Sequence, residues 1–437
     1  MTINDPKYMK VLGVYGGVGS MMIGAKQQGW EVIGNIEERP YYFTGTFEAN
    51  FPGAWMVNSF DALTEEQRAQ AMECDMIIGH PDCGSFSALR QKTGGFESDR
   101  ERISNDIKKF IQSIKEFQPK VFAMDDLPGA MKAVGWEIYH ELLPDYDVYF
   151  EWINNHGYGN IQKNRKRLFV IGAKKELNYV FIPGEFEHNE TILERLAKIS
   201  PDAKNNVQFA DDSRVAGWGK HEVDEKYFGL KGKDDYINFA EFREYVAKQP
   251  LGCFRCFNRS GNMTTRLGKA KIDVNKPSPV ITGGGAQGHH YLFRNDTFMP
   301  FTIRERAKIQ GCPDDFIFIP EMVPEGSNHT YGNLVRQTGK FMPVEFCTFI
   351  TQQFTDLLNG EYSPEKYTCK RVINSNPTIN ESKYEYCKHV GYTDQENACK
   401  FCGSARYCKS QQIKEFNKRQ QEIAFDDCSD DCNKECE

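Results

Sequence analysis

The sequence lacks the features that would place a protein in a membrane, outside the cell or in a repeat architecture. It has no run of eighteen apolar residues, so we expect no membrane-spanning helix. Its first ten residues, MTINDPKYMK, contain no apolar core typical of a signal peptide, and we expect a cytoplasmic protein. No internal repeat is evident, so we do not expect stacked repeats.

The chain also has no overall excess of positive charge. With 54 Lys and Arg against 61 Asp and Glu its net charge is −7, so any basic surface must be local. Hydrophobic residues at 40% and charged residues at 26% are typical of a globular protein, and 437 residues suffice for two or three domains. In a reducing compartment, its 14 cysteines indicate thiols or metal ligands rather than a disulfide framework.

Short apolar runs alternate with helical patterns through the first 175 residues. The segment 101–118 keeps apolar residues at three- and four-residue spacing and ends before Pro119. Strands that alternate with such helices predict an α/β fold, with a mainly parallel sheet and helices on both faces. Such sheets bind ligands at the carboxyl ends of their strands. The expected strands are 10–16, 31–36, 75–80, 120–125, 147–153 and 167–173.

The alternation is lost in residues 186–275, which are polar and irregular. A basic stretch there carries Arg255, Arg259 and Arg266 among aromatic residues, which suits a phosphate-rich partner. A solvated surface would explain the same charges. Regular patterns resume after Lys276, before a tail rich in Cys, Lys and Asn completes the chain.

A glycine-rich segment, VYGGVGSMMIGAKQQGW, follows the first expected strand and opens a helix that Gly29 can end. Glycines in this place let a ligand approach the backbone beside a helix N-terminus, although such turns also serve packing. Glu37 and Glu38 then end the second strand, where a carboxylate commonly accepts hydrogen bonds from ribose hydroxyls. Together these segments favour a cofactor that carries a nucleoside.

Other expected strands end or begin beside reactive and charged groups. Cys83 follows a strand in IIGHPDCGSFSALR, and Asp125 and Asp126 end the next strand. Arg165 and Arg167 enter the last of the six strands. Each group has a simpler explanation, namely a buried thiol, a turn or a solvated strand edge. Because they should meet at one edge of the sheet, they suggest nucleophilic catalysis on an electron-poor substrate.

The order and content of these motifs resemble those of the DNA cytosine methyltransferases that modify carbon 5. VLGVYGGVGS is similar to the family's glycine-rich motif, GHPDCGSFS to its Pro-Cys loop, MDDLPG to its Glu-Asn-Val element, and QKNRKR to its Gln-x-Arg-x-Arg element. KPSPVITGGG and FTIRERAKIQGCPDDFIF are similar to the segment after its target recognition domain. YGNLVRQTGKFMPVEFCTFI is similar to its final Gly-Asn-x-Val helix. The resemblance covers about residues 9–185 and 276–355, in family order.

The resemblance implies a chemical role for four residues. Cys83 would add as a thiolate to carbon 6 of a cytosine flipped out of the duplex. The activated ring would then take a methyl group from S-adenosylmethionine at carbon 5, and loss of the carbon-5 proton would release the thiol. Asp125 would hydrogen-bond the ring nitrogen and the exocyclic amine. Arg167 would hold the carbonyl oxygen of the base, with electrostatic support from Arg165.

The resemblance also implies how the chain is divided. Residues 1–185 and 276–360 would form a Rossmann-like S-adenosylmethionine-dependent methyltransferase domain. Residues 186–275 would form an inserted target recognition domain that reads double-stranded DNA, with Arg255, Arg259 and Arg266 as candidate contacts. We expect a monomer in a prokaryotic or viral host cell, in the setting of restriction–modification. The residues implied to line the cofactor pocket are Tyr15, Gly17, Gly19, Glu37 for the ribose, Phe60 for the adenine, Asn333 and Val335.

Several positions depart from the family pattern. Gly13 and Ser59 stand where the family usually has Asp. Asp82 replaces the proline before the nucleophile, and Asp125 and Asp126 replace Glu-Asn. Two alternatives therefore stay open. One is an enzyme of the same fold that transfers another group, or that acts on a modified base or on RNA. The other is a catalytically degenerate protein that binds DNA.

The tail, residues 361–437, carries a cluster of cysteines. Cys399 and Cys402 form a Cys-x-x-Cys pair, which Cys387 and Cys408 flank. Four thiolates could enclose a structural zinc ion and stabilise a segment too small for a core of its own. A flexible extension with uncommitted thiols is the alternative, because the spacing matches no strict zinc motif.

Overall fold

A computed structural model describes most of the chain between residues 8 and 368. The described ranges are 8–38, 43–82, 95–127, 130, 137–163, 165–184, 189–205, 274–283, 301–320 and 330–368, together with the backbone of strands at 221–222, 236–237, 252–257, 263–272, 290–294 and 297–300. The chain divides into two compact units. The first comprises Met1–His80, Asn154–Arg165 and Glu187–Gln352, and the second comprises Pro81–Ile153, Lys166–Phe186 and Gln353–Glu437.

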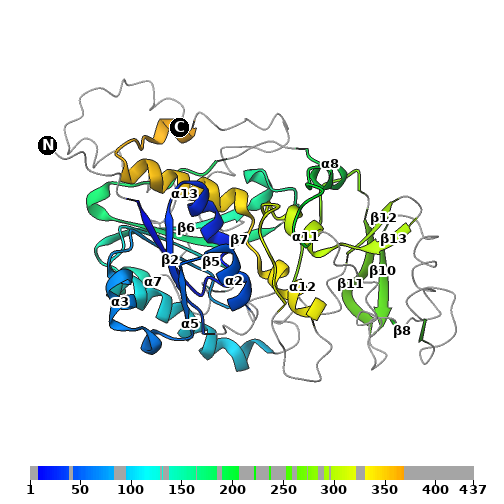
Figure 1. Ribbon diagram of the computed structural model, residues 1–437, viewed down its shortest axis with the longest axis horizontal. Helices are drawn as coiled ribbons and strands as arrows, with labels where there is room; N and C mark the ends of the chain where they lie inside the picture. The colour runs from blue at the N-terminus through cyan, green and yellow to red at the C-terminus, as the bar shows by residue number, and fades with distance from the viewer. Residues whose placement is uncertain are drawn as a thin grey trace, which may run out of the picture. The chain divides into compact units, whose positions relative to one another are not determined.

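Seven strands form one mixed sheet in the order β3-β2-β1-β4-β5-β7-β6 (Figure 1). The six strands expected from the sequence are all present, and the additional β3 is too short to show a periodic pattern. The parallel direction expected from the sequence holds for β3, β2, β1 and β4, and the sheet is mixed because β7 is antiparallel to its neighbour β5. The strands are β1 (Lys10–Val14), β2 (Glu31–Ile36), β3 (Trp55–Val57), β4 (Met76–Gly79), β5 (Val121–Asp126), β6 (Tyr146–Asn154) and β7 (Lys166–Lys174).

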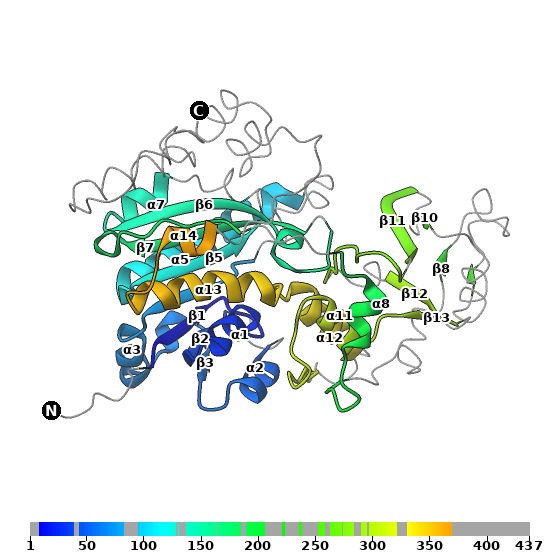
Figure 2. The same cartoon turned by 90° about the horizontal axis from the view of Figure 1, so that it is seen from above.

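In the first unit, α1 (Ser20–Gln27) packs closely against α13 (Val344–Leu358), which it neighbours in Figure 2. A Cβ added to Gly24 would lie 2.6 Å from the Cys347 carbonyl carbon, so only glycine permits this approach. α1 ends before Gly29, whose φ of 82° is left-handed, as the sequence predicts. The other helices of this unit are α2 (Thr44–Asn50), α3 (Glu65–Met72), α8 (Ile192–Ala197), α11 (Ile303–Ile309) and α12 (Thr330–Lys340).

The second unit covers both faces of its strands with aromatic side chains. Neighbouring residues of β6 point to opposite faces, and Phe150 meets Tyr139 of α7 (Glu137–Leu142) while Tyr149 meets Tyr179. On β5, Phe122 meets the long helix α5 (Gly95–Phe117) edge to face. Helices and aromatic loops therefore exclude water from both faces of these strands.

The fold continues beyond α13 into α14 (Pro364–Thr368). The hydroxyl of the buried Tyr367 donates a hydrogen bond to Asp356, and Tyr362 donates one to the carbonyl of Val180. Burial and the bond to Asp356 raise the pKa of Tyr367, so it stays a neutral donor. The first residues of the expected tail extension therefore belong to the folded body, up to Thr368.

Regular strands also occur inside the region expected to be irregular. A second sheet has the order β10-β11-β12-β13, and a separate pair joins β8 to β9. The second sheet extends past residue 275, because β11 pairs with β12 and β12 with β13. Figure 2 shows α8 beside α11 and α12 in the same unit. The strands are β8 (His221–Glu222), β9 (Tyr236–Ile237), β10 (Gly252–Phe257), β11 (Met263–Ile272), β12 (His290–Arg294) and β13 (Thr297–Pro300).

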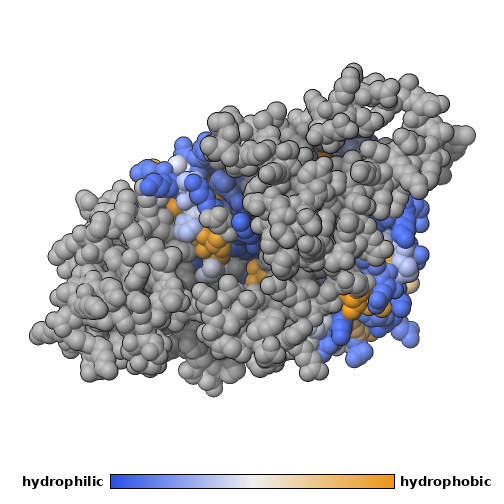
Figure 3. Space-filling view, turned by 180° about the vertical axis from the view of Figure 1, so that it is seen from behind, coloured by the Kyte–Doolittle hydropathy of each residue, from blue (hydrophilic) through white to orange (hydrophobic). Residues whose placement is uncertain are grey.

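None of the helices in the described part of the chain is long and apolar enough to cross a membrane. The described residues on the face shown in Figure 3 are mostly hydrophilic, with small hydrophobic areas among them. Four large hydrophobic side chains are exposed among the described residues, and they are scattered along the sequence rather than consecutive: Tyr8, Met72, Leu193 and Ile319.

Candidate active site

Asn35 of β2 and Glu37, which follows the last residue of β2, hold the glycine-rich loop between β1 and α1. The Gly16 N–H donates to Asn35 Oδ1 at 3.0 Å, and Asn35 Nδ2 donates to the Gly17 carbonyl at 3.1 Å. The Gly17 N–H donates to Glu37 Oε2 at 3.0 Å. Asn35 and Glu37 are two residues apart and both are buried, so the chain at the end of β2 presents them on the same side. The carboxylate expected to bind a ribose thus lies against the loop expected to bind the cofactor.

The loop backbone alternates into the left-handed region at the three positions proposed to line the pocket. φ is 58° at Tyr15, 56° at Gly17 and 86° at Gly19. Such a φ costs a non-glycine residue about 1 kcal/mol. Tyr15 is held there because its N–H donates to Ile36 at 2.7 Å and its carbonyl accepts from His80 at 3.1 Å. Strain maintained in this way is typical of functional sites.

The loop is closed on its inner side and open at Gly17. A Cβ on Gly16 would lie 2.6 Å from Met22 Cε, and one on Gly13 would lie even closer to the same atom. Gly13, where the family usually has Asp, therefore permits this tight packing. A Cβ on Gly17 would meet no atom of the described residues within 4 Å. The backbone is accessible to a ligand at Gly17.

The far end of the chain meets this loop within the first unit. The Met342 N–H donates to Ser20 Oγ at 3.0 Å, at the start of α1. Asn333 and Val335, both buried, lie on α12 a few residues earlier. Asn333 Oδ1 accepts from Gln337 Nε2 at 2.7 Å, while Asn333 Nδ2 has no hydrogen-bond partner among the described residues. A buried donor without a partner is costly, and a bound ligand would relieve that cost.

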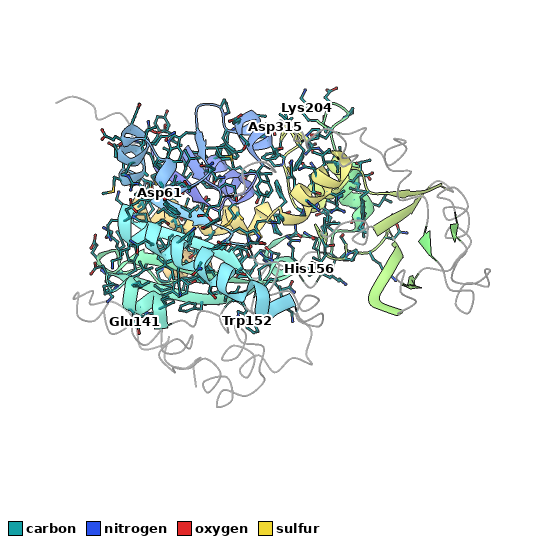
Figure 4. The ribbon with its side chains drawn as sticks, turned by 90° about the horizontal axis from the view of Figure 1, so that it is seen from below. Asp61, Glu141, Trp152, His156, Lys204 and Asp315 are labelled. Carbon is teal, nitrogen blue, oxygen red and sulfur yellow. The ribbon has the colours of Figure 1, made fainter. Side chains whose placement is uncertain are left out.

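Phe60 follows β3 in a short turn. It begins a 3-10 helix, Phe60–Ala62, whose first turn is capped because Ser59 Oγ accepts from the Ala62 N–H at 3.2 Å. Ser59 therefore caps this turn, at a position where the family usually has Asp. Arg68 donates to the Phe60 carbonyl at 3.3 Å and fixes the turn from α3. Figure 4 labels the neighbouring Asp61, which is exposed.

Asp125 and Arg167 form a buried ion pair in the second unit. Arg167 Nε lies 2.8 Å from Asp125 Oδ1 and 3.1 Å from Oδ2, and Nη2 also donates to Oδ2. Asp125 is opposite Phe169 in the antiparallel ladder, so Arg167, two residues earlier, is its diagonal neighbour on the same face. The bidentate geometry fixes the orientation of both groups. The structure therefore brings these two predicted catalytic residues together.

The neighbouring Asp126 bonds to the backbone of the turn that follows β5. Asp126 is buried and accepts a hydrogen bond from the Leu127 N–H at 2.5 Å, so it shapes the turn after β5.

Arg165 belongs to the first unit and is bonded mainly to backbone. Its guanidinium donates to the Ile281 carbonyl at 2.9 Å and to the Phe341 carbonyl at 2.7 Å. Gln162 accepts from Arg165 at 3.4 Å and from the Ile281 N–H at 2.7 Å. These bonds hold three distant segments of the chain together. Arg165 thus holds the backbone of these segments in place, and the electrostatic support expected of it stays a prediction.

Several predicted residues lie outside the described residues, or have only their backbone described. Cys83, Arg259 and the four tail cysteines are outside them. Arg255 and Arg266 lie on adjacent strands, since Arg255 pairs with Leu267. The described residues contain no group of His, Cys, Asp or Glu able to hold a metal ion.

Three polar residues that build the site were not identified from the sequence. Asn35 could have been recognised as a lone amide in the apolar run EVIGNI, two residues before Glu37. Gln337 lies one helical turn after Asn333, a spacing that brings side chains together. Thr46, which donates to Gln337 Oε1 at 2.7 Å, follows no pattern that would single it out.

Comparisons with known proteins find relatives that match most of the chain. The chain is 23% identical over 377 residues to the type II methyltransferase M.FnuDI of Fusobacterium nucleatum, covering 84% of this chain and 99% of that protein. It is 26% identical over 329 residues to the type II methyltransferase M.NgoPII of Neisseria gonorrhoeae, covering 72% and 88%. A candidate DNA modification methyltransferase encoded within an E. coli prophage has the same fold, with a TM-score of 0.53, 20% identity, and coverage of 80% of this chain and 99% of that one.

The family model for C-5 cytosine-specific DNA methylases matches residues 9–356, which include the glycine-rich loop, the Asp125–Arg167 pair and α12. The resemblance inferred from the sequence motifs is therefore confirmed. The chain belongs to the C-5 cytosine-specific DNA methylase family and is a DNA cytosine-5 methyltransferase.

Proposed function

We propose that the chain methylates carbon 5 of a cytosine flipped out of double-stranded DNA, with Cys83 as nucleophile and S-adenosylmethionine as methyl donor. The observation that best supports this proposal is the buried, bidentate contact between Asp125 and Arg167. This pair supplies a fixed carboxylate, which can bind the exocyclic amine, and a fixed positive charge, which can stabilise the base carbonyl oxygen when a thiolate attacks the ring.

The residues of the first unit fit S-adenosylmethionine, whose use family membership implies. Gly17 is open on one side, Glu37 offers a carboxylate to ribose hydroxyls, and Asn333 has a buried donor that no described residue satisfies. When bound, the cofactor supplies an electrophilic methyl group. The remaining residues proposed to line its pocket are Tyr15, Gly19, Phe60 for the adenine, and Val335.

Each catalytic residue has one task in the proposed reaction. The Cys83 thiolate forms a bond to carbon 6, which makes carbon 5 nucleophilic towards the methyl group. Asp125 hydrogen-bonds the ring nitrogen and exocyclic amine, and Arg167 both orients Asp125 and stabilises charge on the base carbonyl oxygen. After transfer, a water molecule accepts the proton of carbon 5, and the electron pair of that C–H bond forms the double bond between carbons 5 and 6. The bond to the sulfur of Cys83 then breaks, and Cys83 leaves as a thiolate.

Replacing Cys83 with Ser tests this proposal. Methyl transfer should be abolished, while binding of S-adenosylhomocysteine and DNA is retained. In the wild-type protein, DNA with 5-fluorocytosine at the target should form a covalent adduct, because fluorine cannot leave as a proton does. Undiminished transfer by the Ser variant would refute the role of Cys83.

We also propose that residues 186–275 form an inserted target recognition domain. The support is the basic segment with Arg255 and Arg266 on neighbouring strands and Arg259 between them. The first relatives found are type II methyltransferases, which supports a restriction–modification setting in a prokaryotic or viral host cell. We expect a monomer. Exchanging 186–275 with the corresponding region of a relative should change the methylated sequence, and unchanged preference would refute the assignment.

Finally, we propose a structural zinc ion held by Cys387, Cys399, Cys402 and Cys408. The support is the Cys-x-x-Cys pair with flanking thiols. Elemental analysis of protein purified without chelator should find about one zinc per chain. Truncation after Thr368 should remove the metal and leave cofactor binding intact. A cut after Asn359 would instead remove the buried Tyr367. Metal-free full-length protein would contradict the proposal.

A further inference from the structure

We propose that Thr46 and Gln337 are positioning residues that fix the orientation of the Asn333 amide, so that its Nδ2 donates to an acceptor of the bound cofactor. This inference rests on the proposed cofactor site and adds residues that the family resemblance does not assign. It starts from a hydrogen-bond network whose polarity is set by the backbone of Ile319.

A backbone N–H can only donate and a carbonyl can only accept, so Ile319 is an unambiguous reference. Its N–H donates to Thr46 Oγ1 at 2.8 Å, and its carbonyl accepts from Gln337 Nε2 at 2.9 Å. The Gln337 atom beside that carbonyl must therefore be the nitrogen. The other amide atom, Oε1, then faces Thr46, whose hydroxyl donates to it at 2.7 Å.

The same polarity continues to Asn333. Gln337 Nε2 has two hydrogens; the second is directed to Asn333 Oδ1 at 2.7 Å. Asn333 must present its oxygen to Gln337, so its Nδ2 faces the other way. That nitrogen is buried and has no partner among the described residues. The network therefore requires a hydrogen-bond acceptor that the described protein does not supply.

The network is anchored on the helix that also contacts the glycine-rich loop. Thr46 lies on α2, and Phe51 directly follows this helix. The Phe51 ring covers Gly19, where an added Cβ would lie 2.3 Å from it. Five residues of helix span only about 7.5 Å. The network that orients Asn333 and the contact with the loop are thus built on one short helix of the first unit.

The acceptor can be of two kinds in S-adenosylmethionine. Its amino-acid part ends in a carboxylate, and its nucleoside part carries ribose and adenine acceptors. The Asn333 amide nitrogen can donate to the carboxylate or to the nucleoside acceptors. A flipped Asn333 amide would instead place its oxygen against the acceptor of the cofactor. The two amide orientations differ little in shape. The Ile319 carbonyl excludes the flipped Gln337 amide, and the Thr46 hydroxyl stabilises the remaining orientation because it donates to Gln337 Oε1.

Thr46→Val tests this role, because it removes the hydroxyl and keeps the shape. Thr46→Ser should retain wild-type behaviour. The matched control is Thr351→Val, which removes another buried hydroxyl. The Thr351 hydroxyl donates a hydrogen bond to the Cys347 carbonyl at 2.6 Å within α13. Affinity for S-adenosylhomocysteine, measured by calorimetry, should fall about five- to tenfold in Thr46→Val only, as expected for one lost hydrogen bond. KM for the cofactor should rise more than kcat falls.

A second variant keeps the network and changes only the group that it presents. Asn333→Asp still accepts from Gln337 but replaces the donor nitrogen with a second oxygen, so binding should fall on the order of 100-fold. 5′-Methylthioadenosine, which lacks the carboxylate, distinguishes the acceptors: the variants weaken its binding only if a nucleoside acceptor is used. Wild-type protein that fails to bind S-adenosylhomocysteine would overturn the proposed function. Wild-type binding together with unaffected Thr46→Val and Asn333→Asp would overturn this inference alone.

Discussion

The glycine-rich end of the first unit and the Asp125–Arg167 pair of the second unit satisfy their polar groups in opposite ways. Around the loop, backbone N–H groups donate to the Asn35 amide and to the Glu37 carboxylate, and the buried Asn333 Nδ2 has no partner among the described residues. In the second unit, two buried charges compensate each other through a bidentate contact. Under our proposal a ligand completes the first region, whereas the two charges of the second region already compensate each other.

This difference predicts what each region contributes. A ligand that supplies a missing acceptor gains affinity, because the protein has already paid the desolvation of the donor. A base that approaches Asp125 and Arg167 must share groups that already bind each other, so these residues gain little affinity for it. Their geometry is fixed before the base arrives, which favours rate over binding. We therefore expect variants of the first region to alter cofactor affinity, and variants of the second to alter turnover.

The largest effect should follow from Asp125→Asn. The variant removes the negative charge opposite Arg167, so kcat should fall on the order of 100-fold or more with little change in cofactor affinity. Unfolding should also become easier by about 3 kcal/mol, because a buried guanidinium loses its counter-charge. Single-turnover methylation and denaturant unfolding measure the two effects. Asp126→Asn is the control, since it retains the oxygen that accepts from Leu127; if Asp126→Asn reduces turnover more, the assignment of Asp125 is wrong.

Glu37→Gln should have the next largest effect and should act on binding. Gln keeps an oxygen that can accept from the Gly17 N–H, so the loop stays in place. It lacks the charged acceptor for ribose hydroxyls, and affinity for S-adenosylhomocysteine should fall about tenfold. The adjacent Glu38→Gln should leave affinity unchanged. Equal effects at both positions would mean that general charge, rather than a specific contact, attracts the cofactor.

A pair of glycine variants separates backbone strain from ligand contact. Gly17 and Gly29 have φ values of 56° and 82°, and at either position an added Cβ would meet no atom within 4 Å in the part of the chain that the structure describes. Gly17→Ala and Gly29→Ala should therefore each lower the free energy of unfolding by about 1 kcal/mol. Only Gly17→Ala should also weaken binding of S-adenosylhomocysteine, by about threefold to fivefold, because its methyl group occupies the open side of the loop. Equal binding by the two variants would place the ligand elsewhere.

The strands and the main catalytic segments could be predicted from the sequence because each has a local signature. Apolar runs bounded by glycine and proline predicted six strands, and positions such as Asp125 and Glu37 followed from strand ends. The antiparallel direction of β7 could not be predicted, because it depends on pairing with β5 far along the chain. Thr46 and Gln337 were missed for the same reason: their partnership joins residues 291 positions apart.

The smallest effects concern two thiols that the protein keeps neutral. Burial is the main cause that raises the pKa of Cys74 and of Cys312 to about 12. Both should therefore resist alkylation by iodoacetamide at pH 8 in the folded protein and react after unfolding, as peptide mapping by mass spectrometry can show. Because their pKa is higher folded than unfolded, the stabilisation is complete below about pH 9 and is lost as the pH rises towards 12. Cys83, as the proposed nucleophile, should be alkylated under the same native conditions. If Cys74 and Cys312 reacted as fast as Cys83, thiol reactivity would not distinguish a group that serves the reaction from groups that serve packing.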